Sequence, residues 1–480
     1  MRKRSKRRYY IYLIIVAVLV WGLVKLLPEI EWSAPEVIIS SDSQFIGPKP
    51  IEIEITDKGK GVKKVEITLN DANGDIELVN KVYDPPVSRD KIVLRLDPAR
   101  IGVTEGKATL RIEAVDASRL RIFVGNKTVA KREFIIDFKP PSISAVTTEH
   151  FINAGGAGLV IYSTSDDVVK SGVELGGYFF PGYRGFFKNP NIGFALFAHP
   201  YDIAGDEPAM LFAEDRAGNI GRSHLPYYLR VKNFKKSTIK VSKRFIQRKM
   251  APLAPLAPIA SPASPSTAPS TAASENAEVK NLFLAVNRDL RRKNNNTIKE
   301  VTSKITPAFL WNGTFHQLSN SQVQANFADH RTYMYNNRKI DDEYHLGYDL
   351  AVVARYPVEA ANSGRVAFSG ELGIYGQSVI IDHGYGLFTL YSHMSSIDVK
   401  KGDRVEKSGI IGRTGQTGIA VGDHLHFGVY LDGVPVNPIE WWDATWLKNN
   451  IISPFEQGEL EFGVSNKHKW FPPKEDEKGK

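Results

Sequence analysis

The sequence contains no cysteine among its 480 residues. This absence excludes disulfide bonds, thiolate zinc sites, iron–sulfur clusters and cysteine nucleophiles. Any metal site must therefore use histidine, aspartate or glutamate side chains. A phosphate-binding loop is also missing, because the glycines at 412, 415, 418 and 422 do not form the G-x-x-x-x-G-K pattern. These glycines indicate tight turns instead.

The length and composition are those of a globular protein with several domains. A chain of this length exceeds what one hydrophobic core usually supports, and 42% hydrophobic with 24% charged residues excludes wholesale disorder. A net charge of +9 is compatible with nucleic-acid binding, but the distribution of the charges along the chain decides this point. Six basic residues lie in 2–8 and nine in 230–249, whereas residues 303–446 carry eleven Lys/Arg against fifteen Asp/Glu. Nucleic acid is therefore not a predicted partner.

The N-terminus has the pattern of a membrane anchor. A basic segment, residues 1–8, precedes an apolar run over residues 9–27, which is about the length that crosses a bilayer as a helix. The alternative is a cleavable signal peptide, but its apolar core would be shorter and no small-x-small site follows. We predict a single transmembrane helix in the inner membrane, with a cytoplasmic N-terminus and a periplasmic or extracytoplasmic remainder.

The chain from residue 33 to residue 230 is predicted to form two β-sandwich-like modules, over 33–139 and 140–230. Residues 51–55 alternate strictly between apolar and charged, and similar short strands recur between turn sequences. Ala213–Asn219 resembles the end of a bacterial immunoglobulin-like module. No catalytic pattern occurs here, so spacer or protein-binding modules are the expectation.

The following part of the chain changes composition twice. Residues 231–302 are predicted to be a basic connector, a Pro/Ala/Ser-rich linker and a short amphipathic helix near 277–292. Residues 303–446 contain dense, glycine-punctuated β segments and are predicted to be a separate β domain. Residues 447–480 remain as a C-terminal tail of unknown role. The predicted fold class is thus mainly β with an N-terminal helix.

Two histidine patterns in residues 303–446 indicate a metal site. His345 and Asp349 form an H-x-x-x-D pair, and His424 and His426 form an H-x-H pair. Residues two apart in a strand point to the same face, and the hairpin sequence at 432–433 supports a strand here. Two imidazoles and one carboxylate are a known catalytic zinc set, which leaves a fourth position open for water.

These motifs resemble those of the LytM/lysostaphin-like zinc metallopeptidases. The similarity covers residues 325–446 and includes three motifs in order: His345-x-Gly347-x-Asp349, Tyr391-Ser392-His393-Met394 and His424-Leu425-His426-Phe427. The resemblance implies that residues 303–446 are the catalytic domain, with an antiparallel β core and a narrow groove, and that it hydrolyses short peptides in peptidoglycan.

The resemblance also implies a role for each matching residue. His345, Asp349 and His426 would bind one zinc ion, and His393 and His424 would be histidines beside the metal. Either of the latter two could act as the general base, because histidine titrates near neutral pH. The sequence leaves that choice open.

Two positions depart from the family pattern or match it loosely. Asp423 stands where the family often has proline, and a turn residue is the favoured interpretation over a carboxylate that orients an imidazole. Arg331 is a candidate for binding a substrate carboxylate, with a surface ion pair as the alternative. His383 is predicted to be structural.

The predicted function is a membrane-anchored zinc metalloendopeptidase that cuts peptides in peptidoglycan. The main alternative is a non-catalytic member of the fold that activates another cell-wall hydrolase. A third interpretation makes the β modules the principal, partner-binding part. The sequence does not show which bond is cut, nor the oligomeric state or the regulatory partners.

Overall fold

The structure is a computed structural model, and it describes residues 3–26, 32–40, 43–118, 125–148, 150–205, 207–258 and 272–465. Strands predominate in these residues, as the sequence predicts. Helix α1 spans Lys3–Leu26, over the segment for which a transmembrane helix is predicted. Within the described residues, however, no helix is both long enough and apolar enough to cross a membrane.

The described chain divides into two compact units. The first contains Met1–Pro141, Asp167–Val169 and Glu214–Gly221, and the second contains Ser142–Asp166, Lys170–Ala213 and Arg222–Lys480. Each unit is described below by itself.

The first unit contains the β-sandwich predicted for residues 33–139. One sheet has the strand order β1-β3-β6 and the other β2-β8-β7-β4-β5. The strands are β1 (Glu36–Ser40), β2 (Phe45–Ile46), β3 (Ile51–Thr56), β4 (Val62–Asp71), β5 (Gly74–Val87), β6 (Arg89–Leu94), β7 (Gly106–Asp116) and β8 (Lys127–Ile136), with the helical turn α2 (Pro98–Ile101) before β7. Alternate residues of β3, such as Ile53 and Ile55, are buried between the sheets, as the alternation in the sequence predicts.

The next β module lies mostly in the second unit. Its two sheets have the strand orders β14-β15-β11-β9 and β13-β12-β16-β17, and β10 pairs with β18. The strands are β9 (Ile143–Ala145), β10 (Phe151–Asn153), β11 (Ala157–Thr164), β12 (Val168–Leu175), β13 (Tyr178–Pro181), β14 (Tyr183–Arg184), β15 (Ile192–Ala198), β16 (Ala209–Asp215), β17 (Ile220–His224) and β18 (Tyr228–Arg230).

The part of the second unit that is predicted to be catalytic, called the catalytic part below, is built on an eight-stranded sheet with the order β20-β23-β31-β27-β26-β25-β29, to which β32 adds beside β31. Its strands are β20 (Gln322–Ala325), β23 (Tyr348–Ala351), β25 (Gly364–Glu371), β26 (Gln377–Gly384), β27 (Leu387–Met394), β29 (Arg404–Val405), β31 (Leu425–Leu431) and β32 (Val434–Val436). All of these pairs are antiparallel, as the family resemblance implies.

Two smaller sheets flank the large one. The first has the order β19-β21-β22, with β19 (Lys236–Lys240), β21 (Asp329–Tyr335) and β22 (Arg338–His345). The second has the order β24-β30-β28, with β24 (Pro357–Glu359), β28 (Ser396–Ile397) and β30 (Ile410–Arg413), and the helical turn η5 (Gly373–Tyr375) lies before β26. Strand β19 pairs in parallel with β21, so the predicted basic connector supplies a strand to the catalytic part.

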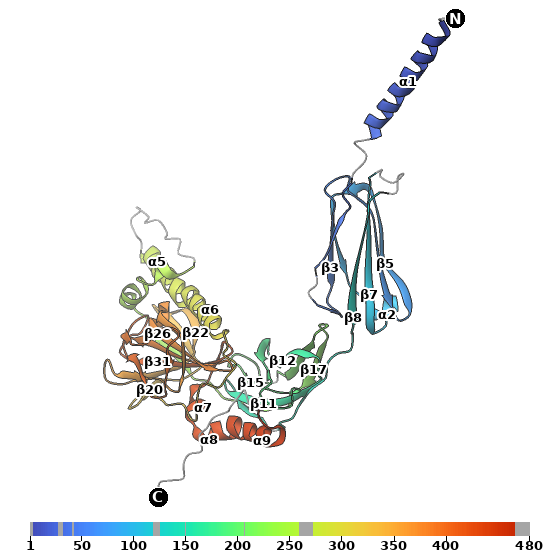
Figure 1. The fold of residues 1–480 in the computed structure, drawn as a ribbon. Helices are drawn as coiled ribbons and strands as arrows, with labels where there is room; N and C mark the ends of the chain where they lie inside the picture. Colours follow the sequence, from blue (N-terminus) through green and yellow to red (C-terminus); the bar gives the residue numbers. More distant parts are fainter. Residues whose placement is uncertain are drawn as a thin grey trace. The chain divides into compact units, whose positions relative to one another are not determined.

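Helices cover one side of the catalytic sheet (Figure 1). They are α4 (Lys243–Phe245), η2 (Ile246–Met250), η3 (Ala254–Leu256), α5 (Ala272–Leu284), η4 (Ala285–Leu290) and α6 (Arg291–Thr302). The helix expected near 277–292 is therefore part of a longer helical run over 272–302. Phe283 and Leu290 of this run are buried in the same core as Ile380 and Phe388 of the sheet. Because this packing stabilises the helical run, it is longer than the apolar pattern at 277–292 indicates. Residues 259–271 of the predicted linker lie outside the described residues.

The predicted tail begins with helices that pack on the second β module. They are α8 (Ala444–Leu447), η6 (Lys448–Ile452) and α9 (Ser453–Phe462), which follow α7 (Pro438–Trp442). Phe455 is fully buried and its ring lies 4.8 Å from that of Phe194. Residues 447–462 thus join the catalytic part to this module through aromatic contacts.

Glu440 of α7 makes a second connection between these two parts. Its carboxylate accepts a hydrogen bond from the Asn153 side chain at 2.6 Å and another from the Ala157 backbone N–H at 2.9 Å. The side chain is buried, and burial raises the pKa of Glu440 to about 7. The folded chain therefore holds this proton at pH values where the unfolded chain has released it.

This buried carboxyl predicts a pH dependence of stability. Because the pKa of Glu440 is higher in the folded chain than in the unfolded chain, where it is about 4.3, its contribution to the free energy of unfolding is fully present below that value. As pH rises through about 7 the contribution is lost, and the free energy of unfolding falls by up to ~3 kcal/mol. Thermal unfolding of the full chain between pH 5 and 7.5 should show this loss, and Glu440→Gln should reduce it. The exposed Glu456→Gln is the matched control and should behave as wild type. An unchanged pH dependence in Glu440→Gln would contradict the prediction.

Candidate metal centre and active site

Three neighbouring strands bring together the predicted metal ligands. His345 is the last residue of β22, Asp349 lies in β23, and His426 lies in β31 directly opposite Asp349 in the antiparallel register. Opposed residues of an antiparallel pair lie on one face, so this register brings Asp349 and His426 together. Gly347 permits the close turn between His345 and Asp349, because a Cβ there would lie 2.5 Å from the Phe427 carbonyl oxygen.

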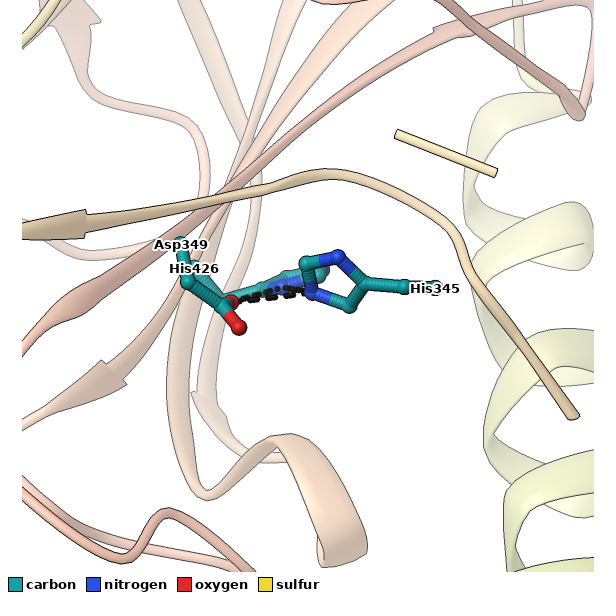
Figure 2. A group of neighbouring side chains, drawn as sticks. All are labelled: His345, Asp349 and His426. Atoms are coloured by element: carbon teal, nitrogen blue, oxygen red, sulfur yellow. Dashed lines mark hydrogen bonds and ion pairs between the residues drawn. The ribbon is translucent and has the colours of Figure 1, made fainter. Parts of the chain in front are cut away.

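The three ligand atoms converge on a single point (Figure 2). His345 Nε2 lies 2.9 Å from Asp349 Oδ1 and 3.0 Å from His426 Nδ1, and the last two atoms are 3.0 Å apart. Tetrahedral zinc with ligands at about 2.0–2.1 Å would separate them by about 3.3 Å. The donor set therefore fits zinc after shifts of a few tenths of an ångström.

Hydrogen bonds outside the cluster fix the protonation of the surrounding imidazoles. A carbonyl oxygen only accepts, so each Nδ1 that faces one must donate a proton. His345 donates in this way to Asn326 at 3.0 Å, His393 to Thr417 at 2.9 Å and His424 to Gly422 at 2.8 Å. The Nε2 atom of His345 is thereby left free to bind a metal, as in known zinc sites.

The surroundings of the site lower the pKa values of both Asp349 and His426. Burial alone would raise the pKa of Asp349, but the charge of His345 and the hydrogen bonds from the imidazoles hold that pKa well below its usual range. Burial lowers the pKa of His426 to about 4. Near neutral pH the cluster therefore offers an ionised carboxylate and a neutral imidazole, which are the forms that bind zinc.

His393 and His424 line the same pocket as the cluster without supplying an atom to it. Their rings lie 5.0 Å apart, and His393 lies 5.9 Å from the ring of His426. Burial holds the pKa of His393 well below its usual value, and His424 and His426 add to this effect. Burial would also lower the pKa of His424, but the Asp349 carboxylate, whose Oδ1 lies 3.6 Å from His424 Nε2, outweighs burial and raises that pKa.

The backbone of His393 is strained. Its φ is 63°, in the left-handed region that residues other than glycine rarely adopt. The register between β26 and β27 shifts at this point, between the pairs Gln377↔Met394 and Val379↔Tyr391, so His393 lies in a β-bulge. Bulges redirect side chains at functional sites, and here the bulge places the imidazole beside the metal cluster.

Arg331 lies at the site but is already paired. Its guanidinium Nη2 lies 3.3 Å from Asp349 Oδ2, and its Nε lies 3.4 Å from Asp329 Oδ2. Asp329 is itself buried and accepts a hydrogen bond from the Ser237 hydroxyl at 2.7 Å. Arg331 thus contacts the second oxygen of a predicted metal ligand, and a role in binding a substrate carboxylate stays a prediction.

His383 and Asp423, the two other residues considered in the sequence analysis, both form hydrogen bonds within the fold. His383 is fully buried between the Ser363 carbonyl and the Thr389 hydroxyl, each at 2.7 Å, so it is structural as predicted. Asp423 lies in a bend before β31, and its carboxylate accepts a hydrogen bond at 3.1 Å from the backbone N–H of Arg355, which is distant in the sequence.

A pocket of about 450 Å³ opens above the cluster. Its floor contains the predicted metal ligands together with His393 and His424. Its walls include Tyr375 and residues 419–423, and also Phe245, Asn287 and Arg291 from the helices outside the motifs. Sequence reasoning missed these helical wall residues, because no local pattern links them to the histidines.

Comparison with known proteins agrees with this geometry. Residues 343–438 match the model of Peptidase family M23, so the C-terminal part of the chain carries a Peptidase M23 domain. This confirms the domain that the motifs predict.

Curated relatives are similar to this chain over a part of its length. The DD-carboxypeptidase/endopeptidase Mpg of Neisseria meningitidis serogroup B is 40% identical over 95 residues, or 20% of this chain and 22% of that protein. The peptidoglycan DD-endopeptidase ShyA of Vibrio cholerae is 34% identical over 119 residues, or 25% of this chain and 27% of that protein. The chain thus matches about a quarter of the length of these relatives.

A solved structure is also similar to part of the chain. The catalytic domain of lysostaphin from Staphylococcus simulans is 26% identical, and the match covers 26% of this chain and 92% of that one with a TM-score of 0.22.

Proposed function

We propose that this chain is a zinc metalloendopeptidase that hydrolyses peptide bonds in peptidoglycan stems or cross-links. The observation that carries the proposal is the convergence of His345 Nε2, Asp349 Oδ1 and His426 Nδ1 on one point at the floor of a pocket. Relatives named DD-endopeptidase support the substrate class.

The residues of the pocket have separate tasks in this reaction. Zinc, when held by His345, Asp349 and His426, supplies a Lewis acid and can lower the pKa of water to about 7. The Nδ1 atoms of His393 and His424 donate to backbone carbonyl oxygens, so the Nε2 atom of one of them can accept a proton from the attacking water and pass it to the leaving amine. The other, when protonated, can donate a hydrogen bond to the developing negative charge on the carbonyl oxygen.

Arg331 is a positioning residue in this mechanism. By contacting Asp349 Oδ2, it leaves Oδ1 to face the two metal-binding imidazoles. Its positive charge also offsets the carboxylates of Asp349 and Asp329 in a buried place.

The alternative is a non-catalytic chain that activates another wall hydrolase. Activators of this kind would not need a complete metal site. All five positions are filled here and lie around one pocket, which favours an enzyme.

Metal removal tests the proposal. The purified full chain should release soluble fragments from isolated sacculi, and a chelator should lower this release to background. One equivalent of zinc should restore it, because the ligands are preformed. Release that continues in excess chelator would contradict zinc dependence. An activator alone would release nothing from sacculi free of other hydrolases.

We also propose an extracytoplasmic location for the catalytic part. The proposal rests on the basic residues at 2–8 followed by the apolar segment 9–27. The lipid bilayer would then be a partner of this segment. Protein partners of the β modules remain a prediction.

A further inference from the structure

Arg291 is an arginine in the wall of the active-site pocket, outside the region that matches the peptidase family. It is the first residue of α6 and follows the π-helical turn η4. The pocket thus contains two guanidinium groups, those of Arg291 and Arg331.

Asn287 fixes the orientation of Arg291. The guanidinium donates from Nε to the Asn287 backbone oxygen at 2.9 Å and from Nη2 to its Oδ1 at 2.8 Å. Asn287 is fully buried, and its Nδ2 donates to Asp341 at 3.0 Å. The arginine is therefore held in place on one side by neutral acceptors, and less entropy is lost when its remaining donors bind a ligand.

The charge of Arg291 is not neutralised by a contacting carboxylate in the described part of the chain. Three other arginines near Arg291 each form an ion pair with an aspartate: Arg331 with Asp349, Arg288 with Asp341 and Arg292 with Asp289. Burial raises the pKa of Glu343, and the positive charge of Arg291 opposes this rise without a direct contact. Arg291 therefore offers a positive charge at the wall of the pocket that holds the metal cluster, with no carboxylate of the described residues in direct contact and with Glu343 acting on it from a distance.

We propose that Arg291 binds a free carboxylate of the peptide substrate and so selects acidic peptides. This inference rests on the proposed function, because it assigns a substrate group to the same pocket. A planar guanidinium with free N–H donors binds carboxylates in a defined geometry, which a neutral amide group cannot reproduce. Arg331 is the less available of the two guanidinium groups, because two aspartates already contact it.

Binding and cleavage of matched peptides test this inference. Three versions of one soluble stem peptide are titrated into the zinc-loaded full chain by calorimetry: all carboxylates free, C-terminus amidated, and side-chain carboxyl amidated. Wild type should bind the free acid about 10–100-fold more tightly than one of the amides, and that amide identifies the carboxylate. Arg291→Gln should remove this difference, whereas Arg291→Lys should keep part of it.

The control is Arg292→Gln, on the same helix but paired with Asp289 outside the pocket lining. It should retain wild-type selectivity. Equal binding of all three peptides by wild type, or an equal loss for all three in Arg291→Gln with zinc content intact, would overturn the role of Arg291. Selective binding without any cleavage would instead contradict the proposed function and leave the role of Arg291 supported.

Discussion

His426→Ala is expected to abolish both zinc binding and peptide hydrolysis. His426 is 4% exposed and supplies one of three converging ligand atoms. With two ligands left, the site can no longer hold zinc in a stable tetrahedral arrangement, and catalysis loses several kcal/mol of charge stabilisation. We expect activity on sacculi to fall at least ~10³-fold and zinc content, measured by mass spectrometry of the metal, to fall below 0.1 equivalent.

His316→Ala is the matched control for this loss. His316 is an exposed histidine of the same domain, and its ring contacts the Ser408 hydroxyl away from the pocket. Zinc content and activity should be those of wild type. Wild-type activity in His426→Ala, or normal zinc content without His426, would show that the metal centre lies elsewhere.

Replacement of His393 or His424 is expected to separate metal binding from catalysis. Neither side chain supplies an atom to the ligand cluster, so zinc content should stay near one equivalent in both variants. Loss of a proton-transfer group should lower kcat about 10²–10⁴-fold. The variant with the larger loss and a changed pH profile identifies the base.

The choice of substitution at His393 matters because of its backbone. Alanine at φ 63° would add strain, whereas asparagine tolerates the left-handed region and cannot act as a base at neutral pH. His393→Asn therefore tests the imidazole with the least effect on the fold, and thermal unfolding should match wild type. Full activity in His393→Asn and in His424→Ala would contradict the proposed roles, as would loss of zinc from both.

The sequence predicts the metal ligands because their signals are local. His345 and Asp349 lie four residues apart, and His424 and His426 are two apart beside a strand whose hairpin turn at 432–433 is visible in the sequence. The buried strands around them also follow from apolar patterning. Leu425 is buried, but so is every other residue of β31, so burial alone does not show the expected alternation in this strand.

Other features depend on contacts between distant parts of the chain. The bulge that strains His393 arises from its pairing with β26 and has no sequence signal of its own. Arg291 reaches the pocket because the helical run over 272–302 packs on the sheet. The pairing of β19 with β21 is not predicted either, because the sequence of β19 reads as a basic connector. Residues 447–462 look like a tail in the sequence, because their aromatic partners lie in the second β module.

The most direct measurement of the central claim is mass analysis of the fragments that the full chain releases from purified sacculi. The account predicts fragments with intact glycan, in which each cut has added one water to a peptide bond, and no such fragments from His426→Ala. Fragments cut within the glycan, or the same peptide products from His426→Ala, would contradict a zinc-dependent peptidase.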